Sequence, residues 1–281
     1  MSFSQLISSL DICMFFLKEY KAKKIKAPDI FKNRDRILSS KNKNLIFLLD
    51  KRFSWMKRYI NGKKIIVELG SGNGCIKKII NNKKIILTDI IKYPWIDKKV
   101  DMLKVNLEKK YQKKVDVFII NHSLHHCSSP YKTLKKISFY LKKNGYVLIN
   151  EPETSFFLKF IQILIDDESW SLKSKVFSSK NIFNPKSPWI SNTAVAQLLF
   201  KNNNKFQNYF PQYKIVENKL SEFFIFLNSG GVNSSFFYFK LNFFFLKILN
   251  IIDNILIFFL PSIFALNRTV VLKKINDKKK L

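Results

Sequence analysis

Three closely spaced glycines follow a short apolar run, in the sequence Glu68-Leu69-Gly70-Ser71-Gly72-Asn73-Gly74. Glycines at this spacing let the backbone turn sharply and approach a ligand without a clash from Cβ atoms. A helix that begins behind such a turn presents free N–H groups to the ligand. The pattern is therefore typical of a crevice for a nucleotide-type ligand at the carboxyl end of a strand.

Two kinds of ligand compete for this turn. A dinucleotide-binding turn has the pattern G-x-G-x-x-G, which would require its third glycine where the chain has Cys75. The third glycine comes one residue earlier, at Gly74. The carboxylate of Glu68 also suits a cationic ligand, such as a sulfonium with an α-amino group, better than a pyrophosphate. The turn therefore disfavours a dinucleotide.

Carboxylates also follow the next two apolar stretches. Asp89 ends the stretch Lys84–Asp89, where a carboxylate can accept hydrogen bonds from both hydroxyls of a ribose. The competing interpretation of Asp89 is a residue that caps a helix. Asp101 and Met102 directly follow Val100 in the next stretch.

All 3 histidines lie in the loop Asn121-His122-Ser123-Leu124-His125-His126-Cys127, directly after an apolar run. We expect no metal there, because the chain has no further histidine to complete a site and neighbouring residues on a tight loop point in divergent directions. His125 or His126 is a candidate general base for a hydroxyl, since the pKa of imidazole lies near neutral pH. Alternatively, both histidines only shape the pocket. The sequence leaves these two interpretations open.

The elements that must position these residues alternate between short apolar runs and helical segments. Continuous apolar strands separated by helices indicate a parallel sheet covered on both faces. The predicted strands are Ile65–Leu69, Lys84–Asp89, Val100–Met102, Val115–Ile120 and Tyr146–Ile149, and the predicted helices between them are Cys75–Ile80 and Tyr131–Leu141. Outside this region we expect helices at Phe3–Tyr20, Asn44–Ile60, Phe156–Ile165 and Ala194–Phe200, strands at Tyr213–Val216 and Thr269–Leu272, and a strand or loop at Ser221–Gly231.

The segment Lys240–Leu260 is strongly apolar but carries polar residues at 240, 247, 250 and 254. This spacing predicts an amphipathic helix with a wide apolar face. Charges in its middle argue against a helix that spans a membrane. The helix either packs on the sheet, which we favour, or lies at a membrane interface, so peripheral membrane contact through 240–260 is the second interpretation.

The formal net charge of +30 permits a nucleic-acid partner. Arginine, the preferred residue for bidentate phosphate contacts, occurs only at Arg34, Arg36, Arg52, Arg58 and Arg268, and the lysines are spread along the chain. We therefore do not expect a nucleic-acid surface. The 3 cysteines form no metal or disulfide pattern and no secretory signal is evident, which predicts a cytoplasmic protein, with a place at the inner face of the membrane as an option.

The turn at Glu68–Gly74 resembles motif I of class I S-adenosylmethionine-dependent methyltransferases. The stretch from Ile65 to Glu151 is similar to the type 11 methyltransferase domain, where a Leu-His-His loop, a Pro, a helix and a Gly-initiated strand follow the fourth strand. This chain supplies them as Leu124-His125-His126, Pro130, Tyr131–Leu141 and Gly145–Ile149. The family usually has Pro-Gly-Gly before its fifth strand, and this chain has Lys143-Asn144-Gly145 instead.

The resemblance implies an α/β fold, a Rossmann-like, seven-stranded and mostly parallel sheet in the order 3-2-1-4-5-7-6 with helical N-terminal and C-terminal cover. Its divisions are an N-terminal helical cover at 1–60, a cofactor-binding core at 61–152 and, at 153–281, a substrate-covering insert with the last strands. The implied cofactor is S-adenosyl-L-methionine. The implied cofactor residues are Glu68, Gly70, Ser71, Gly72, Gly74, Asp89, Ile90, Asp101, Met102 and Asn121, with Asp101 at the adenine amino group, and the implied catalytic residues are His125 and His126.

The expected reaction is methyl transfer to a small-molecule acceptor, a hydroxyl on a sugar, a lipid-linked molecule or a secondary metabolite. One alternative is an RNA methyltransferase, which the charge permits. However, the chain has Asn121-His122-Ser123-Leu124 where base-amine methylases carry an Asn-Pro-Pro-Tyr-type motif. The other alternative is a non-catalytic, membrane-associated protein that binds the cofactor.

Overall fold

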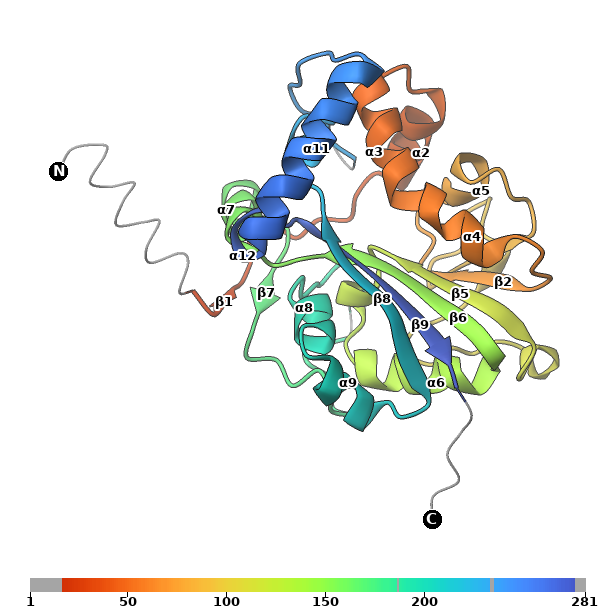
Figure 1. The fold of residues 1–281 in the computed structure, drawn as a ribbon. Coiled ribbons are helices and arrows are strands. Elements are labelled where there is room, and N and C mark those ends of the chain that lie inside the picture. The colour runs from red at the N-terminus through yellow and green to blue at the C-terminus, as the bar shows by residue number, and fades with distance from the viewer. Residues whose placement is uncertain (1–16, 186, 233–234, 276–281) are drawn as a thin grey trace.

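The computed structural model describes residues 17–185, 187–232 and 235–275. Its centre is a seven-stranded sheet in the order β4-β3-β2-β5-β6-β9-β8 (Figure 1). The strands are β2 (Ile66–Leu69), β3 (Ile85–Asp89), β4 (Lys98–Lys99), β5 (Val115–Asn121), β6 (Leu141–Pro152), β8 (Tyr213–Ser221) and β9 (Asn267–Lys274). β9 runs antiparallel to both β6 and β8, and the remaining pairs are parallel. The predicted order 3-2-1-4-5-7-6 is confirmed.

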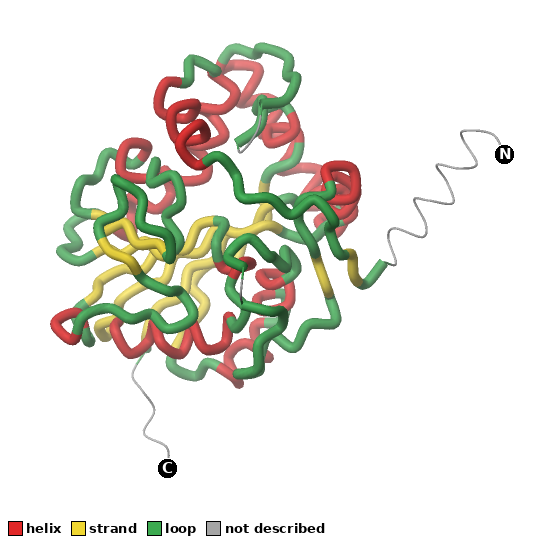
Figure 2. Tube along the Cα trace, turned by 180° about the vertical axis from the view of Figure 1, so that it is seen from behind, coloured by secondary structure: helices red, strands yellow, loops and turns green. Residues whose placement is uncertain are grey.

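Helices lie on both faces of this sheet (Figure 1). They are α2 (Ile30–Ser39), α3 (Lys43–Phe53), α4 (Lys57–Ile60), α5 (Ile76–Ile79), α6 (Pro130–Tyr140), α7 (Phe156–Ile165), α8 (Val195–Phe200), α9 (Asn203–Tyr209), α10 (Phe224–Leu227), α11 (Phe243–Phe259) and α12 (Pro261–Phe264). Short 3-10 turns occur at η1 (Ser54–Met56), η2 (Lys109–Tyr111) and η3 (Leu124–His126). Viewed from behind, the strands form a central layer between helices, and long loops cover one end of the sheet (Figure 2).

Alternate residues of the strands fill two separate cores, because successive side chains of a strand point to opposite faces. On β5, Phe118 and Ile120 pack with residues of α6, α8 and α9, such as Leu134. Val117 and Ile119 pack on the other face with residues of α3, α4 and α5. The sheet is therefore buried on both sides, and only the ends of its strands are free to bind a ligand.

Several sequence predictions differ from the structure. The strand expected at Val100–Met102 is placed two residues earlier, at β4, and Ser221–Gly231 contains the short helix α10. The helix predicted at Phe3–Tyr20 lies mostly outside the described residues, and its end is wrong: Glu19–Tyr20 forms strand β1, which pairs with β7 (Trp170–Ser171). Tyr20 stacks on buried Trp170, a tertiary contact that outweighs the local helical pattern.

Helix α11 does not bury its wide apolar face, which contradicts the favoured interpretation that it packs on the sheet. Its buried residues are Leu246, Asp253 and Ile257. The Asp253 carboxylate accepts hydrogen bonds from the backbone N–H groups of Phe223, Phe224 and Ile225 at 2.8–3.1 Å. The helix is therefore oriented by a buried polar contact. Within the described ranges no helix has the length and hydropathy that crossing a membrane requires.

Candidate active site

One cavity of about 680 Å³ lies at the carboxyl ends of β2, β3, β5 and β6. Both motifs singled out from the sequence meet there, although they are far apart in the chain. Residues of the glycine turn, of the stretches after β3 and β4, and of the histidine loop all line it, namely Gly70, Ser71, Gly72, Asp89, Ile90, Asp101, Met102, Asn121, His125 and His126. Glu68 and Gly74, which were also assigned to the cofactor, are not among the residues that line it.

Each glycine of the turn has a positive φ, but the three serve different purposes. At Gly70 (φ 71°) an added Cβ would lie 2.6 Å from the Cβ of Ser123, so the glycine allows the histidine loop to approach. At Gly74 (φ 62°) it would meet the ring of Trp95 at 2.6 Å. At Gly72 (φ 48°) nothing lies within 4 Å. Gly72 is thus the position where the backbone borders open space, as a ligand cradle requires.

Asp89 fixes the turn from the end of β3. Its Oδ2 accepts a hydrogen bond from the backbone N–H of Gly72 at 2.8 Å, and its Oδ1 accepts one from Ile91 at 3.0 Å. The indole N–H of Trp95 donates to the Gly72 carbonyl oxygen at 2.8 Å. The carboxylate keeps lone pairs for two further donors on the cavity side, because each oxygen accepts more than one hydrogen bond.

Glu68 is buried at the end of β2, where its Oε2 has no hydrogen-bond partner. Burial raises the pKa of its carboxyl group to about 8. Ser71 holds the two strands together, since its N–H donates to the Thr88 carbonyl oxygen at 2.9 Å and its Oγ accepts from the Thr88 N–H at 3.1 Å. The backbone of the turn is therefore held by hydrogen bonds, and the buried carboxyl group of Glu68 beside it has one oxygen without a hydrogen-bond partner.

Asp101 and Met102 line the cavity beyond the end of β4. Asp101 accepts a hydrogen bond from the Leu103 N–H at 2.8 Å. Ile90 lines the cavity with a side chain that is 42% exposed. Asn121 is less free, because its Oδ1 accepts a hydrogen bond from Asn150 at 2.8 Å.

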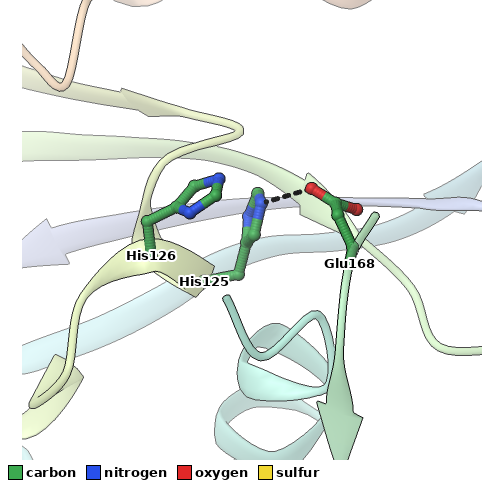
Figure 3. Close-up of side chains that lie close together, drawn as sticks. All are labelled: His125, His126 and Glu168. Atoms are coloured by element: carbon green, nitrogen blue, oxygen red, sulfur yellow. Dashed lines mark hydrogen bonds and ion pairs between the residues drawn. The ribbon is translucent and has the colours of Figure 1, made fainter. Parts of the chain in front are cut away.

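His125 lies between two carboxylates. Its Nδ1 is 2.5 Å from Oε2 of Glu151, a buried residue of β6. Its Nε2 is 3.3 Å from Oε1 of Glu168, in the loop after α7, and Figure 3 shows this second contact. Burial alone would lower the pKa of this histidine, but Glu151 and Glu168 outweigh it and raise the pKa to about 10. Both ring nitrogens of His125 therefore carry a proton at neutral pH and donate to the two carboxylates.

His126 lies beside His125, with the ring centroids 4.3 Å apart (Figure 3). Its Nδ1 is 3.2 Å from the Ile190 carbonyl oxygen, which can only accept, so Nδ1 carries the proton. Burial and the neighbouring charge on His125 lower the pKa of His126 to about 4. The ring is thus neutral, and Nε2 retains its lone pair.

Glu151 and Glu168 are the functional residues that the sequence analysis missed. Glu151 also anchors the loop itself, because its Oε1 accepts hydrogen bonds from the N–H groups of Ser123 and Leu124, both at 2.7 Å. Its position at the end of the fifth parallel strand, level with the histidine loop, was a usable signal. Glu168 lies 43 residues after His125, in a loop without a recognisable motif, and carried no such signal.

The sequence matches a family model described as a methyltransferase domain over residues 32–211. The chain belongs to this methyltransferase family. It is an enzyme whose methyl donor is S-adenosylmethionine, which confirms the resemblance found in the sequence.

The chain is similar to several solved structures. A SAM-dependent methyltransferase from Archaeoglobus fulgidus is 15% identical with a TM-score of 0.50, covering 88% of this chain and 100% of its own. The YcgJ protein from Bacillus subtilis is 10% identical, with a TM-score of 0.43 and coverage of 81% and 99%. The CurJ carbon methyltransferase is 12% identical, with a TM-score of 0.43 and coverage of 88% and 59%. No curated protein matches the sequence.

The residues at the turn fit this cofactor on the structure's own terms. Gly72 borders open space, Asp89 retains acceptor capacity, and Glu68 holds a buried carboxyl oxygen without a partner. A cationic ligand at the turn would favour the ionised form of the Glu68 carboxyl group, which burial otherwise disfavours.

Proposed function

We propose that this methyltransferase acts on a small-molecule acceptor, a hydroxyl group on a sugar, a lipid-linked molecule or a secondary metabolite. The observation that carries the proposal is the cavity of about 680 Å³, which borders both the glycine turn and the histidine loop. Cavities of about 300–1,000 Å³ are typical of small-molecule sites. Its other walls include apolar side chains of both covers, such as Ile37 and Leu49 from the N-terminal part and Trp189 from the C-terminal part.

We assign the cofactor to Gly70, Gly72, Asp89, Ile90, Asp101 and Met102. Asp89 would accept hydrogen bonds from the ribose hydroxyls, and Asp101 would accept one from the adenine amino group. The glycines would let the backbone approach the cofactor closely. Bound S-adenosylmethionine supplies an electrophilic methyl group on its sulfonium. The residues of the chain orient the acceptor toward that side and exclude water, and such placement accounts for a large share of rate enhancement.

The two histidines have different roles in this proposal. A general base must be unprotonated, which favours His126, whose pKa is lowered to about 4, over His125, whose pKa is raised to about 10. Nε2 of His126 would accept the proton of the acceptor hydroxyl. His125, fixed by Glu151 and Glu168, would position that ring and the acceptor.

The test is mass spectrometry of extracts incubated with the protein and S-adenosylmethionine that carries an isotopically labelled methyl group. We expect one labelled small molecule with the native chain and none with Asp89→Ala. His126→Asn should lower turnover by about 10²–10⁴-fold, the usual contribution of a general base, while cofactor affinity in calorimetry persists. Label that appears only in RNA would overturn the small-molecule proposal, and unchanged turnover in His126→Asn would overturn the base.

We further propose the functional division into a helical cover at 1–60, a cofactor-binding core at 61–152 and a substrate-covering part at 153–281. Two buried ion pairs support this division, one between the helical cover and the substrate-covering part and one within the substrate-covering part. Arg52 of α3 pairs with Glu222 at 2.6 Å, and Arg268 of β9 pairs with Glu153 at 2.6 Å. Arg52 also lines the cavity.

Finally, we propose that the enzyme works at the inner face of the cytoplasmic membrane. Large apolar side chains 38–80% exposed form one surface, here called the α11 surface, at 236, 237, 239, 243–245, 248, 251, 252, 255 and 258–260. Exposed apolar areas of this extent mark interaction sites. Lys240 and Lys247 are exposed within it, and such cations attract anionic lipids. Phe236 also lines the cavity, so a lipid-linked acceptor could enter from the bilayer side.

Vesicle flotation tests this placement. The full chain should float with vesicles that contain phosphatidylglycerol, and less with pure phosphatidylcholine. The double variant Phe237→Ser/Phe258→Ser removes two side chains that are 80% and 79% exposed and should lose flotation. The matched control is Phe139→Ser, 49% exposed on α6, across the sheet from α11 (Figure 1). Absence of flotation in the native chain, or equal flotation of the double variant, would contradict membrane contact.

A further inference from the structure

Beside the cofactor half of the cavity, His125, His126 and Glu168 form a cluster with the composition of a metal site. Each residue offers one ligand atom, and these atoms lie within 4.8 Å of one another (Figure 3). All three residues line the cavity. The expectation of no metal rested on the lack of a further histidine and on divergent side chains in the loop. The carboxylate of Glu168, brought in from the loop after α7, removes the first premise, and the short distance of 4.3 Å between the ring centroids of His125 and His126 removes the second.

The hydrogen bonds of the two rings resemble those of metal-binding histidines. Such histidines almost always donate one ring N–H to a carboxylate or backbone carbonyl group, which fixes the ring and leaves the other nitrogen for the metal. Here Nδ1 of His125 bonds Glu151 at 2.5 Å, and Nδ1 of His126 bonds the Ile190 carbonyl oxygen at 3.2 Å. In both rings Nε2 is therefore the nitrogen that remains to act as a ligand.

The remaining geometry agrees with this assignment. Nε2 of His125 lies 3.3 Å from Oε1 of Glu168, close to the separation of two ligands that share one ion at bonds of about 2.1 Å. The other carboxylate oxygen of Glu168 accepts a hydrogen bond from Gln162 at 3.3 Å, which orients the group. Three protein ligands would leave at least one coordination position open toward the cavity.

We infer that His125, His126 and Glu168 bind a divalent first-row transition-metal ion in the acceptor half of the cavity. Two imidazole nitrogens and one carboxylate suit Zn²⁺, Mn²⁺, Fe²⁺ or Co²⁺ better than Mg²⁺ or Ca²⁺, which prefer oxygen ligands. The ion takes the place of the proton on Nε2 of His125. Nε2 of His126 would then hold the ion instead of acting as the base. A hydroxyl coordinated at the open position would have a lower pKa and would release its proton to water, as would Nε2 of His125, which deepens the proposed function by naming what activates the acceptor.

Metal binding can be measured without any acceptor. Tag-free full-length protein, treated with a chelator and dialysed, is titrated with Co²⁺ by visible absorption and with Zn²⁺ by calorimetry. We expect one ion per chain and d–d bands characteristic of mixed nitrogen and oxygen ligands. Glu168→Gln and His126→Asn should each weaken binding by at least about tenfold, since even outer-shell changes cost 10–100-fold.

The matched control is His122→Asn, which removes the third histidine of the same loop. His122 has φ 47°, a conformation that Asn tolerates, and it is outside the cluster. This variant should bind the ion as the native chain does. Binding that is absent in the native chain, or unchanged in Glu168→Gln and His126→Asn, would overturn the site. Circular dichroism confirms that each variant is folded.

The same samples separate this inference from the proposed function on which it rests. S-adenosylmethionine affinity, measured in parallel, should persist in Glu168→Gln. A chain that binds the cofactor and methylates a small molecule without binding any of these ions would overturn the metal site and leave His126 as the base. A chain that binds the ion at these residues but yields no labelled small molecule would overturn the proposed function instead.

Discussion

The two halves of the cavity are built from different materials. The proposed cofactor half is a backbone structure, in which glycines with positive φ turn the chain and Asp89 accepts a hydrogen bond from the Gly72 N–H of that turn. The acceptor half is a side-chain network, in which buried Glu151 fixes both the histidine loop and His125. A change in the first half should therefore act mainly on ligand affinity. A change in the second should act first on stability, because it leaves a buried charge without its partner.

The strongest test of this contrast is Glu151→Gln. The substitution removes the charge beside His125 and weakens the acceptor for the N–H groups of Ser123 and Leu124. Removal of one partner of a buried pair costs about 3–5 kcal/mol of the free energy of unfolding. Chemical denaturation should show a loss of this size. The control is Glu108→Gln, an exposed residue paired with Lys98 and Lys110, which should leave the denaturation midpoint unchanged. An unchanged midpoint for Glu151→Gln would contradict the contrast.

Asp89→Ala should change the free energy of unfolding less than Glu151→Gln does. Its main effect should be on the affinity for S-adenosylmethionine. The variant loses the acceptors for the N–H groups of Gly72 and Ile91, as well as the proposed ribose contacts. Hydrogen bonds to a charged group contribute about 1.5–3 kcal/mol each, so loss of the two proposed ribose contacts should raise the dissociation constant of S-adenosylmethionine by at least about 100-fold. Calorimetry measures this change.

Variants of two other aspartates provide comparisons for the affinity of Asp89→Ala. Asp101→Ala removes one acceptor, that for the Leu103 N–H, together with the proposed adenine contact, and should weaken cofactor binding by about tenfold. Asp50→Ala, on an exposed position of α3, should leave the affinity unchanged. Equal affinities for the native chain and Asp89→Ala would remove the cofactor from this turn.

The contrast also explains which parts of the site the sequence reveals. The glycine turn and Asp89 are visible because their geometry follows from spacing along two neighbouring strands. The alternation of strands and helices indicates a parallel sheet, whereas the strand order comes from the family resemblance. The pairing of His125 with Glu168 depends on how the loop after α7 folds back, and no local pattern encodes it. For α11 the pattern revealed the helix but not its orientation, because the buried contact of Asp253 with α10 involves residues 28–30 positions away.

The smallest expected effect concerns the pH dependence of stability in the acceptor half. His125 has a pKa raised from 6.5 to about 10, so the folded state binds a proton that the unfolded state releases. Its contribution is fully present below pH 6.5 and is lost as the pH rises through 10. The difference in melting temperature between the native chain and His125→Asn should therefore narrow from pH 6.5 to 10.

His126→Asn supplies the matched comparison, because the pKa of His126 moves in the opposite direction, from 6.5 down to about 4. The unfolded state then binds the extra proton, so the native chain loses stability relative to this variant as the pH falls from 6.5 toward 4. Between pH 7 and 10 the difference in melting temperature should stay constant. The two variants should thus change their melting temperatures relative to the native chain in different pH ranges. This outcome requires that the carboxylates of Glu151 and Glu168 stabilise a positive charge on His125 and not on His126. If both variants changed their melting temperatures in the same pH range, the two rings would share one proton. The assignment of His126 as the neutral histidine would then be wrong.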